Sequence, residues 1–278
     1  MQSPAKNLPI AMFDSGVGGL TVLHECLVSL PHEDFVYLGD TARFPYGNRD
    51  QDELQEFALE LAELLLADGA KLLVVACNSA TAAALPKLRA ELNGRVGVVA
   101  VVEPESRLAA RETRNGRVGL LATPATVESG AYERALSDAV PDARIHPVAC
   151  PELAPMIQAG DEFDQRIVDL VEGYCEPLRA AQVDTVILGC THYPLVRPIL
   201  QRALGRGVTI VSSGQAIADA VHEELTVEGI ENDTDRRGRY SFLSTGDSEA
   251  FRAVGTRFLQ MPLGQVRQVA VREARKAA

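Results

Sequence analysis

The sequence has 278 residues, of which 46% are hydrophobic and 23% charged, and it carries a formal net charge of −11. This composition is typical of a globular protein with a large buried core, and the negative charge argues against non-specific binding to nucleic acid or to an anionic membrane. The apolar runs stop far short of the roughly 18 residues that a membrane-spanning helix needs, and residues 1–10 lack the pattern of a signal peptide. We therefore expect a cytoplasmic protein with neither a membrane nor a nucleic-acid partner.

Continuous apolar runs, rather than alternating ones, mark the predicted strands, and this pattern is typical of strands buried on both faces of a parallel sheet. Helical stretches fill most of the segments between them, as at 52–69 and 163–181. The alternation of buried strands with helices predicts an α/β fold. The apolar runs, in chain order, cover residues 8–13, 34–39, 72–77, 96–102, 117–123, 185–190 and 208–213.

The ends of these strands recur with the same layout in the two halves of the chain. This recurrence predicts two similar parallel-sheet α/β domains related by a pseudo-twofold axis, with a site in the cleft between them. We expect residues 1–103 and 213–278 to form the first domain and 104–212 the second, because a helix at 214–225 and a strand at 239–245 should fold back onto the first unit. The paired strand ends fall near Asp14, Asp40, Cys77 and Glu103, and near Thr123, Cys150, Cys190 and Ser212.

Two of the five cysteines, Cys77 and Cys190, lie at equivalent strand ends of the two units. An odd number of cysteines argues against a disulfide framework, so each thiol is judged by its own surroundings. Ligands bind beyond the carboxyl ends of the strands in open α/β sheets, and each of these cysteines is predicted to start a helix, whose N-terminus stabilises a thiolate. A lone cysteine at a strand end is more often a small core residue, but the repeated position favours a catalytic role.

Two thiols that face each other across a cleft can exchange protons with both faces of one carbon atom, which is the chemistry of a racemase. Because a free thiol with a pKa of about 8.5 is mostly protonated at neutral pH, each thiol needs a neighbouring group that assists it. His192 is placed to assist Cys190, and Asp14 is a candidate to assist Cys77 as a proton relay or as a contact for an ammonium group. Both also have simpler interpretations, since His192 could be a capping or surface residue and Asp14 could cap the next helix.

Other chemistries fit the sequence less well. The stretch DSGVGG at 14–19 lacks the Gly-Lys-Ser/Thr ending of a phosphate-binding loop. A metal site built from the two cysteines, His192 and Asp14 would lack the local spacing typical of metal ligands. Pyridoxal phosphate needs a lysine for its Schiff base, but the lysines lie in the tails, along a helix or, for Lys71, roughly 20 Å from the active end of its strand. We therefore expect neither a cofactor nor a metal.

A series of motifs, in order along the chain, resembles those of bacterial glutamate racemases: DSGVGG, YLGDTARFPYG, ACNSATAAAL, VVEP, TVESGAY and GCTHYPL. The resemblance covers nearly the whole chain and includes STGDSEAF near its end. It implies an enzyme that interconverts L- and D-glutamate without a cofactor and supplies D-glutamate for peptidoglycan synthesis. It also implies two α/β domains with the site between them, and a homodimer.

The resemblance further implies roles for individual residues. Cys77 matches the cysteine that acts on the D-enantiomer and Cys190 the one that acts on the L-enantiomer, with Asp14 and His192 as their assisting residues. Backbone N–H groups at helix starts, hydroxyls and amides would hold the two carboxylates of glutamate. The implied substrate contacts are Asp14, Ser15, Pro45, Tyr46, Gly47, Asn78, Ser79, Thr191 and His192.

Two positions depart from the family pattern. Gln158 stands where the family often carries a glutamate that orients the histidine, and a neutral amide would not raise the basicity of His192. Ser79 replaces a common threonine and keeps the hydroxyl. The alternatives are a related racemase for aspartate, whose members usually carry an acidic residue in place of His192, and an additional role in binding DNA gyrase, which some glutamate racemases have.

Overall fold

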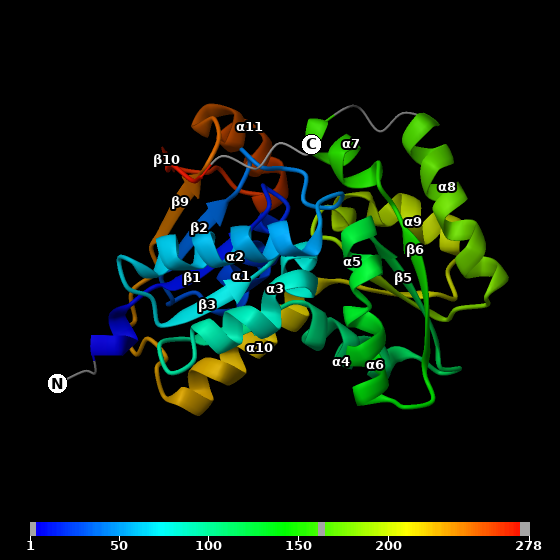
Figure 1. The fold of residues 1–278 in the computed structure, drawn as a ribbon, viewed down its shortest axis with the longest axis horizontal. Helices are drawn as coiled ribbons and strands as arrows, with labels where there is room; N and C mark the ends of the chain where they lie inside the picture. Colours follow the sequence, from blue (N-terminus) through cyan, green and yellow to red (C-terminus); the bar gives the residue numbers. More distant parts are fainter. Residues whose placement is uncertain (1–3, 161–164, 273–278) are drawn as a thin grey trace.

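The chain forms two parallel β-sheets that lie side by side, each surrounded by helices (Figure 1). The structure is a computed structural model, and it describes residues 4–160 and 165–272. The first sheet has the strand order β10-β9-β2-β1-β3-β4 and the second β6-β5-β7-β8. The strands are β1 Ile10–Asp14, β2 Phe35–Gly39, β3 Leu72–Val75, β4 Gly97–Ala100, β5 Arg117–Ala122, β6 Arg144–Ala149, β7 Thr185–Gly189, β8 Thr209–Val211, β9 Tyr240–Ser244 and β10 Val266–Gln268.

The two sheets repeat one topology, as the strand spacing predicts. In each unit the first strand pairs with the second and the third, and the fourth pairs with the third, all in parallel. Strand β9 pairs with β2, and β10 pairs with β9, so residues 240–268 return to the first sheet. The predicted fold of two parallel-sheet α/β domains is therefore confirmed, and β3 and β7, which precede Cys77 and Cys190, occupy equivalent places.

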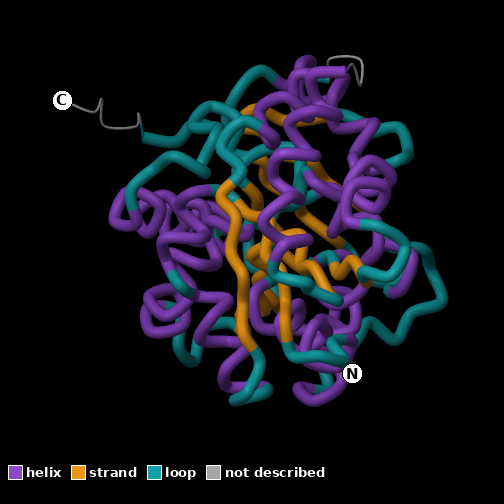
Figure 2. Tube along the Cα trace, turned by 90° about the vertical axis from the view of Figure 1, so that its right-hand side faces the viewer, coloured by secondary structure: helices purple, strands orange, loops and turns teal. Residues whose placement is uncertain are grey.

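Helices cover both faces of the first sheet. Apolar residues on one face pack against α1, α10 and α11, in a core that continues into the second domain, while those on the other face pack against α2 and α3. Figure 2 shows the strands in the interior with helices outside them. The helices are α1 Leu20–Ser29, α2 Gln51–Leu66, α3 Asn78–Glu91, α4 Val102–Glu112, α5 Pro124–Ser129, α6 Ala131–Ala139, α7 Leu153–Ala159, α8 Gln165–Ala180, α9 Arg197–Leu204, α10 Ser213–Glu228 and α11 Ser248–Leu259, with 3-10 helices η1 Pro4–Asn7 and η2 Tyr193–Val196.

One predicted strand end is wrong. The apolar run at 96–102 is not a single strand, because β4 ends at Ala100 and α4 begins at Val102. The start of α4 is itself buried and tolerates Pro104, since residues in the first turn of a helix need no N–H donor. Glu103 therefore lies inside α4, the helix that carries the chain from one sheet to the other.

The segment after Cys190 also differs from the prediction of a helix that starts directly at the cysteine. A turn leads into η2, and α9 follows it. Pro198 has no N–H for the carbonyl of Pro194 four residues earlier, and its ring clashes with that carbonyl, so one continuous helix cannot form. The helix predicted at 163–181 begins within the described residues at Gln165 and ends at Ala180.

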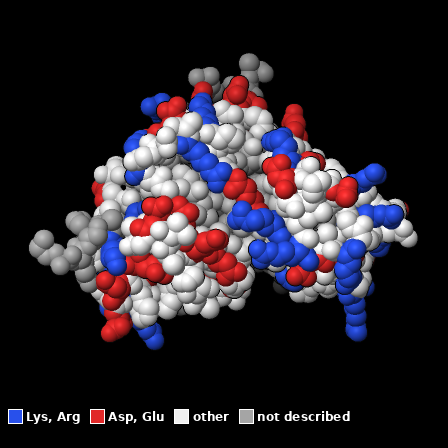
Figure 3. All heavy atoms as spheres, turned by 90° about the horizontal axis from the view of Figure 1, so that it is seen from below, with Lys and Arg blue, Asp and Glu red and all other residues white. Residues whose placement is uncertain are grey.

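Charged side chains are mixed over the face drawn in Figure 3, where basic residues occur in short runs bordered by acidic ones. Within residues 4–160 and 165–272, no helix is both long enough and apolar enough to cross a membrane.

Candidate active site

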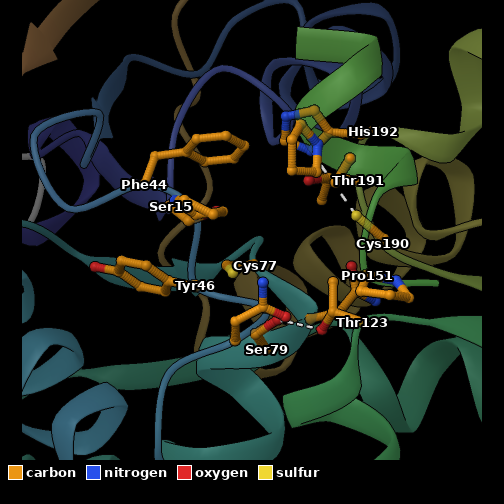
Figure 4. A pocket seen from close by; sticks show the side chains of 16 residues that line it. Ser15, Phe44, Tyr46, Cys77, Ser79, Thr123, Pro151, Cys190, Thr191 and His192 are labelled. Atoms are coloured by element: carbon orange, nitrogen blue, oxygen red, sulfur yellow. Dashed lines mark hydrogen bonds between the residues drawn. The ribbon is translucent and has the colours of Figure 1, made fainter. Parts of the chain in front are cut away.

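A small cavity lies where β1 and β3 of the first sheet and β5 and β7 of the second end. The side chains of Cys77 and Cys190 both border it, with open space between them (Figure 4). The walls come from both domains. The lining residues are Ser15, Phe44, Pro45, Tyr46, Gly47, Asn48, Cys77, Asn78, Ser79, Thr123, Pro151, Ala154, Pro155, Cys190, Thr191 and His192.

Cys77 is the N-cap of α3, as the sequence predicts. Its Sγ accepts a hydrogen bond from the backbone N–H of Ala80 at 3.5 Å. Burial, followed by the charge of Asp14, raises the pKa of the Cys77 thiol to about 12, against the opposing effect of hydrogen bonds from Ala80 and Ser15. At pH 7 Cys77 is therefore a protonated thiol, and it becomes a strong base once it is ionised.

Cys190 lies next to an imidazole. Its Sγ is 3.8 Å from Nδ1 of His192, and Nε2 of the same ring is 2.9 Å from Oε1 of Gln158. With the amide oxygen of Gln158 as acceptor, Nε2 carries the ring proton and Nδ1 is left to accept a proton from the thiol. Burial raises the pKa of Cys190 well above its usual value, and the charges of Asp14 and Cys77 raise it too.

His192 is enclosed by aromatic rings. The ring of Phe44 lies 5.5 Å from it on one side, and the ring of Phe258 from α11 approaches edge-on at 5.2 Å. This burial lowers the pKa of His192 to about 3, so the ring is neutral at pH 7. The neutral ring has a free Nδ1 that faces the thiol of Cys190 as an acceptor, but its lowered pKa makes it a weak base for that role.

Asp14 lies near both thiols rather than near Cys77 alone. Its carboxylate accepts hydrogen bonds from the backbone N–H of Gly16 at 2.9 Å and from the hydroxyl of Thr191 at 3.3 Å. Burial raises the pKa of Asp14, and these hydrogen bonds oppose the rise. Because Asp14 raises the pKa of Cys77 and also of Cys190, it disfavours both thiolates, and a nearby cation would offset this effect.

The loop between β1 and α1 presses against the second domain. A Cβ atom at Gly18 would lie 2.3 Å from Oγ1 of Thr191 and 2.5 Å from Nδ1 of His192. Only glycine fits at such a distance, so the second Gly of DSGVGG sets the close approach of the two domains beside Cys190.

Hydroxyl groups from both domains meet on the other side of the cavity. The hydroxyl of Ser79 lies 2.9 Å from that of Thr123 and 3.3 Å from that of Thr126, and the two threonines are 3.0 Å apart. Such a group of neutral donors can hold a carboxylate without a cation. Ser79 thus keeps the hydroxyl that the family pattern has at this position.

The loop that carries Pro45, Tyr46 and Gly47 is held by a buried ion pair. Arg43 Nε donates to Asp40 at 2.6 Å, and the hydroxyl of Tyr46 donates to the same carboxylate. Figure 4 shows the Tyr46 hydroxyl turned away from the cavity. Tyr46 therefore offers the cavity its ring and backbone rather than its hydroxyl.

The structure places the sequence-predicted residues together. All of them line the cavity except Asp14, which lies buried behind it and contacts Thr191. Thr123 also lines the cavity, although the sequence analysis did not name it as a site residue. It could have been found by its position, because it directly follows β5 while Asp14 ends the equivalent strand β1. Phe44 lies inside the quoted FPYG segment. Asn48 directly follows that segment. Pro151, Ala154 and Pro155 belong to residues 149–160, the stretch that contains Gln158.

Two further expectations concern groups outside the cavity. Lys71 is paired with Glu33 at 2.5 Å, at the opposite end of β3 from Cys77. In the part of the chain that the structure describes, no cluster of three or more His, Cys, Asp or Glu side chains is arranged to hold a metal ion.

Comparisons with known proteins agree with this geometry. Residues 22–221 match the sequence model of the family Asp/Glu/hydantoin racemase. A glutamate racemase from Beutenbergia cavernae is 44% identical over 90% of this chain and 89% of its own length. The crystal structure of glutamate racemase isoform RacE1 from Bacillus anthracis superposes with a TM-score of 0.89 at 36% identity, over 98% of this chain and 100% of that one. A glutamate racemase from Thermus thermophilus, solved with β-chloro-D-alanine, gives a TM-score of 0.84 at 42% identity, over 96% and 98% of the two chains.

Proposed function

The chain belongs to the Asp/Glu/hydantoin racemase family, and from this premise we propose that it interconverts L- and D-glutamate without a cofactor. The observation that supports this most strongly is the pair of thiols at equivalent strand ends of two like units, both bordering one cavity. Relatives at 42 to 44% identity that carry the name glutamate racemase favour glutamate over aspartate as the substrate.

The reaction moves one proton across one carbon atom. Starting from D-glutamate, the thiolate of Cys77 removes the α-proton, and the thiol of Cys190 delivers its own proton to the opposite face. Cys77 ends as a thiol and Cys190 as a thiolate, so the enzyme is left ready for the reverse reaction. When L-glutamate meets an enzyme whose Cys190 is still a thiol, that thiol must first lose its proton, and Nδ1 of His192, 3.8 Å from the sulfur, is the group placed to accept it.

The cavity supplies groups for each part of glutamate. The hydroxyls of Ser79 and Thr123 suit one carboxylate, and backbone N–H groups of the loop at 46–48 suit the other. Asp14 lies buried behind the cavity wall near both thiols, so its charge favours an ammonium group bound in front of it. An ammonium group beside Asp14 would also offset the charge that disfavours each thiolate.

We also propose that the D-glutamate made here supplies peptidoglycan synthesis, that the enzyme works in the cytoplasm and that it forms a homodimer, as the family resemblance implies. Depletion of the protein should then be rescued by external D-glutamate, and light scattering should give twice the chain mass. Binding to DNA gyrase stays a prediction. A pull-down that survives Cys77→Ser and Cys190→Ser would establish it as a separate function.

The first test uses L-glutamate in D₂O with chelator-treated protein and no added pyridoxal phosphate. We expect the α-proton signal and the optical rotation to disappear together. Exchange of the α-proton without loss of optical rotation would mean that the enzyme removes and returns the proton on one face of the carbon only. No change in either signal, with D-glutamate as well as L-glutamate, would contradict the proposal and bring both aspartate enantiomers forward.

A further inference from the structure

The motif STGDSEAF, residues 244–251, lies beside the loop that forms one wall of the cavity. Its first residue, Ser244, ends β9 and pairs with Gly39, the last residue of β2. Because these parallel strands end at the same edge of the sheet, the residues that follow them, Thr245 and Asp40, come together there. Among the described residues that line the cavity, none belongs to 244–251. The motif can therefore act on the site only through its neighbours.

Hydroxyl groups join this motif to the segment that precedes the cavity loop. The hydroxyl of Thr245 donates to Oδ1 of Asp40 at 2.7 Å and accepts from the backbone N–H of Ala42 at 3.0 Å. The hydroxyls of Ser244 and Thr41 lie 2.8 Å apart. Thr245 is itself buried, so these bonds are shielded from competing water. Two segments that lie about 200 residues apart in the sequence are thus held in one arrangement.

Asp40 carries this contact on to the cavity wall. It is fully buried, and its two carboxylate oxygens have different partners. Oδ1 is bound by Thr245, whereas Oδ2 accepts from Nε of Arg43 at 2.6 Å and from the hydroxyl of Tyr46. Fixing one oxygen of a rigid carboxylate also fixes the other. The hydroxyl of Tyr46 points away from the cavity in Figure 4, and its bond to Asp40 anchors the loop from behind.

We propose that Thr245 is a positioning residue that acts through Asp40 to hold the backbone at 46–48 in the conformation that binds a carboxylate of the substrate. The inference rests on the proposed function, in which N–H groups of this loop bind one of the two carboxylates of glutamate. Backbone donors move only with their loop, so they bind tightly when the loop is ordered before the substrate arrives.

The central test is Thr245→Val, which keeps the shape of the side chain and replaces the hydroxyl by a methyl group. We expect the KM for both glutamate enantiomers to rise about tenfold, as for the loss of a hydrogen bond to a charged group, with kcat within about threefold. Glutarate has both carboxylates but no ammonium group. Because it needs the same loop, its dissociation constant, measured by calorimetry, should rise by a similar factor.

Two further variants are controls for the hydroxyl. Thr245→Ser retains it and should keep the KM within about twofold of the wild-type value. Thr256→Val is the matched substitution on α11, outside the cavity, where the hydroxyl donates at 2.9 Å to the backbone oxygen of Arg252 in the same helix. This change should leave the KM unaltered.

The route through Asp40 is tested from its other end with Tyr46→Phe, which keeps the ring and removes the hydroxyl that binds the carboxylate. We expect the KM to rise about fivefold, a result that does not require Thr245→Val to fold. In the double variant the KM should rise by clearly less than the product of the two single rises, because both changes loosen one carboxylate. A rise equal to that product would contradict the route through Asp40.

Other outcomes would overturn the proposal as a whole. A lower kcat with an unchanged KM in Thr245→Val would reflect only a smaller folded fraction, and so a merely structural role. A KM as high in Thr245→Ser as in Thr245→Val would exclude the hydroxyl, and unchanged glutarate binding would exclude a carboxylate site. Absence of racemisation in the wild-type protein would count against the proposed function, whereas glutarate binding decides the role of Thr245 without turnover.

Discussion

The two thiols occupy the same place in two copies of one topology, yet their surroundings differ. Cys77 caps a 14-residue α-helix and accepts a hydrogen bond from the backbone of that helix. Cys190 is followed by a turn and a short 3-10 helix, and its neighbour is the ring of His192, which Gln158 orients. Of these groups, Asp14 is the one whose charge raises the pKa of both thiols.

The comparison separates two sources of function. The shared strand order brings each sulfur atom to the edge of the cavity, because β3 and β7, which precede the two cysteines, both end there. The residues that follow each cysteine then decide how its proton is handled. We therefore expect changes on one side to affect one enantiomer more than the other, and the predictions below use that asymmetry.

The largest effect should come from removing either thiol. Cys77→Ser and Cys190→Ser should each lower racemisation by about a thousandfold or more, because serine is a far weaker proton donor and base at this pH. Elimination of hydrogen halide from a halogenated glutamate analogue needs only one base, so each variant should retain it for one enantiomer. Chiral chromatography of the remaining analogue measures this.

Comparable elimination of both enantiomers by one of these variants would contradict the two-base mechanism. Cys175→Ser serves as a control, because Cys175 is a buried cysteine on α8 outside the cavity.

The next largest effect concerns the imidazole on the Cys190 side. His192→Asn keeps a hydrogen-bonding side chain but removes the proton acceptor, and we expect a loss of about a hundredfold in elimination from the L-analogue. Elimination from the D-analogue should change much less, since Cys77 lacks an imidazole neighbour. His146→Asn on β6 is the matched control. Equal losses for both enantiomers would mean that His192 serves the whole cavity.

The third prediction concerns pH. A raised thiol pKa means that the thiolate fraction is small at neutral pH and grows about tenfold with each pH unit until the pKa is reached. With a pKa of about 12, Cys77 in the empty enzyme should react with iodoacetamide about ten times faster at pH 9 than at pH 8. Mass spectrometry of the peptide that contains Cys77 measures the rate. A plateau near pH 8 would show that the thiol is already ionised there.

The smallest effect should follow from loosening the orientation of His192. Gln158→Ala removes the acceptor of Nε2, so the ring can adopt either tautomer, and we expect about a fivefold loss in the L-side half-reaction, the equivalent of one hydrogen bond. Gln158→Glu restores the acceptor, and its charge should raise the pKa of His192 and make Nδ1 more basic. A slower L-side reaction in Gln158→Glu than in Gln158→Ala would contradict this view.

Much of the fold could be predicted from the sequence, because apolar runs that alternate with helices directly reflect strands buried on both faces. Residues next to a strand end, such as Cys77 and Asp14, were found by the same signal. Thr123 could have been found by it too, since the repeat pairs it with Asp14.

Other features depend on contacts between distant segments. Phe258 belongs to α11, yet its ring packs against His192. Glu105 on α4 and Tyr132 on α6 both contact Asn78 on α3. No local pattern records such pairings. The helix expected after Cys190 was wrong for a local reason, the spacing of Pro194 and Pro198, which periodicity alone does not detect.

The repeated strand order also has a consequence for the ancestry of the molecule. A gene that encoded one such unit would yield a symmetric pair with one cysteine from each partner at a shared cleft. Inversion of a chiral carbon needs a similar group on each face, so such a pair would already have been competent for it. Fusion of two such copies would free each half to diverge, and the two cysteines now differ in this way, with an imidazole beside Cys190 and a capped helix at Cys77.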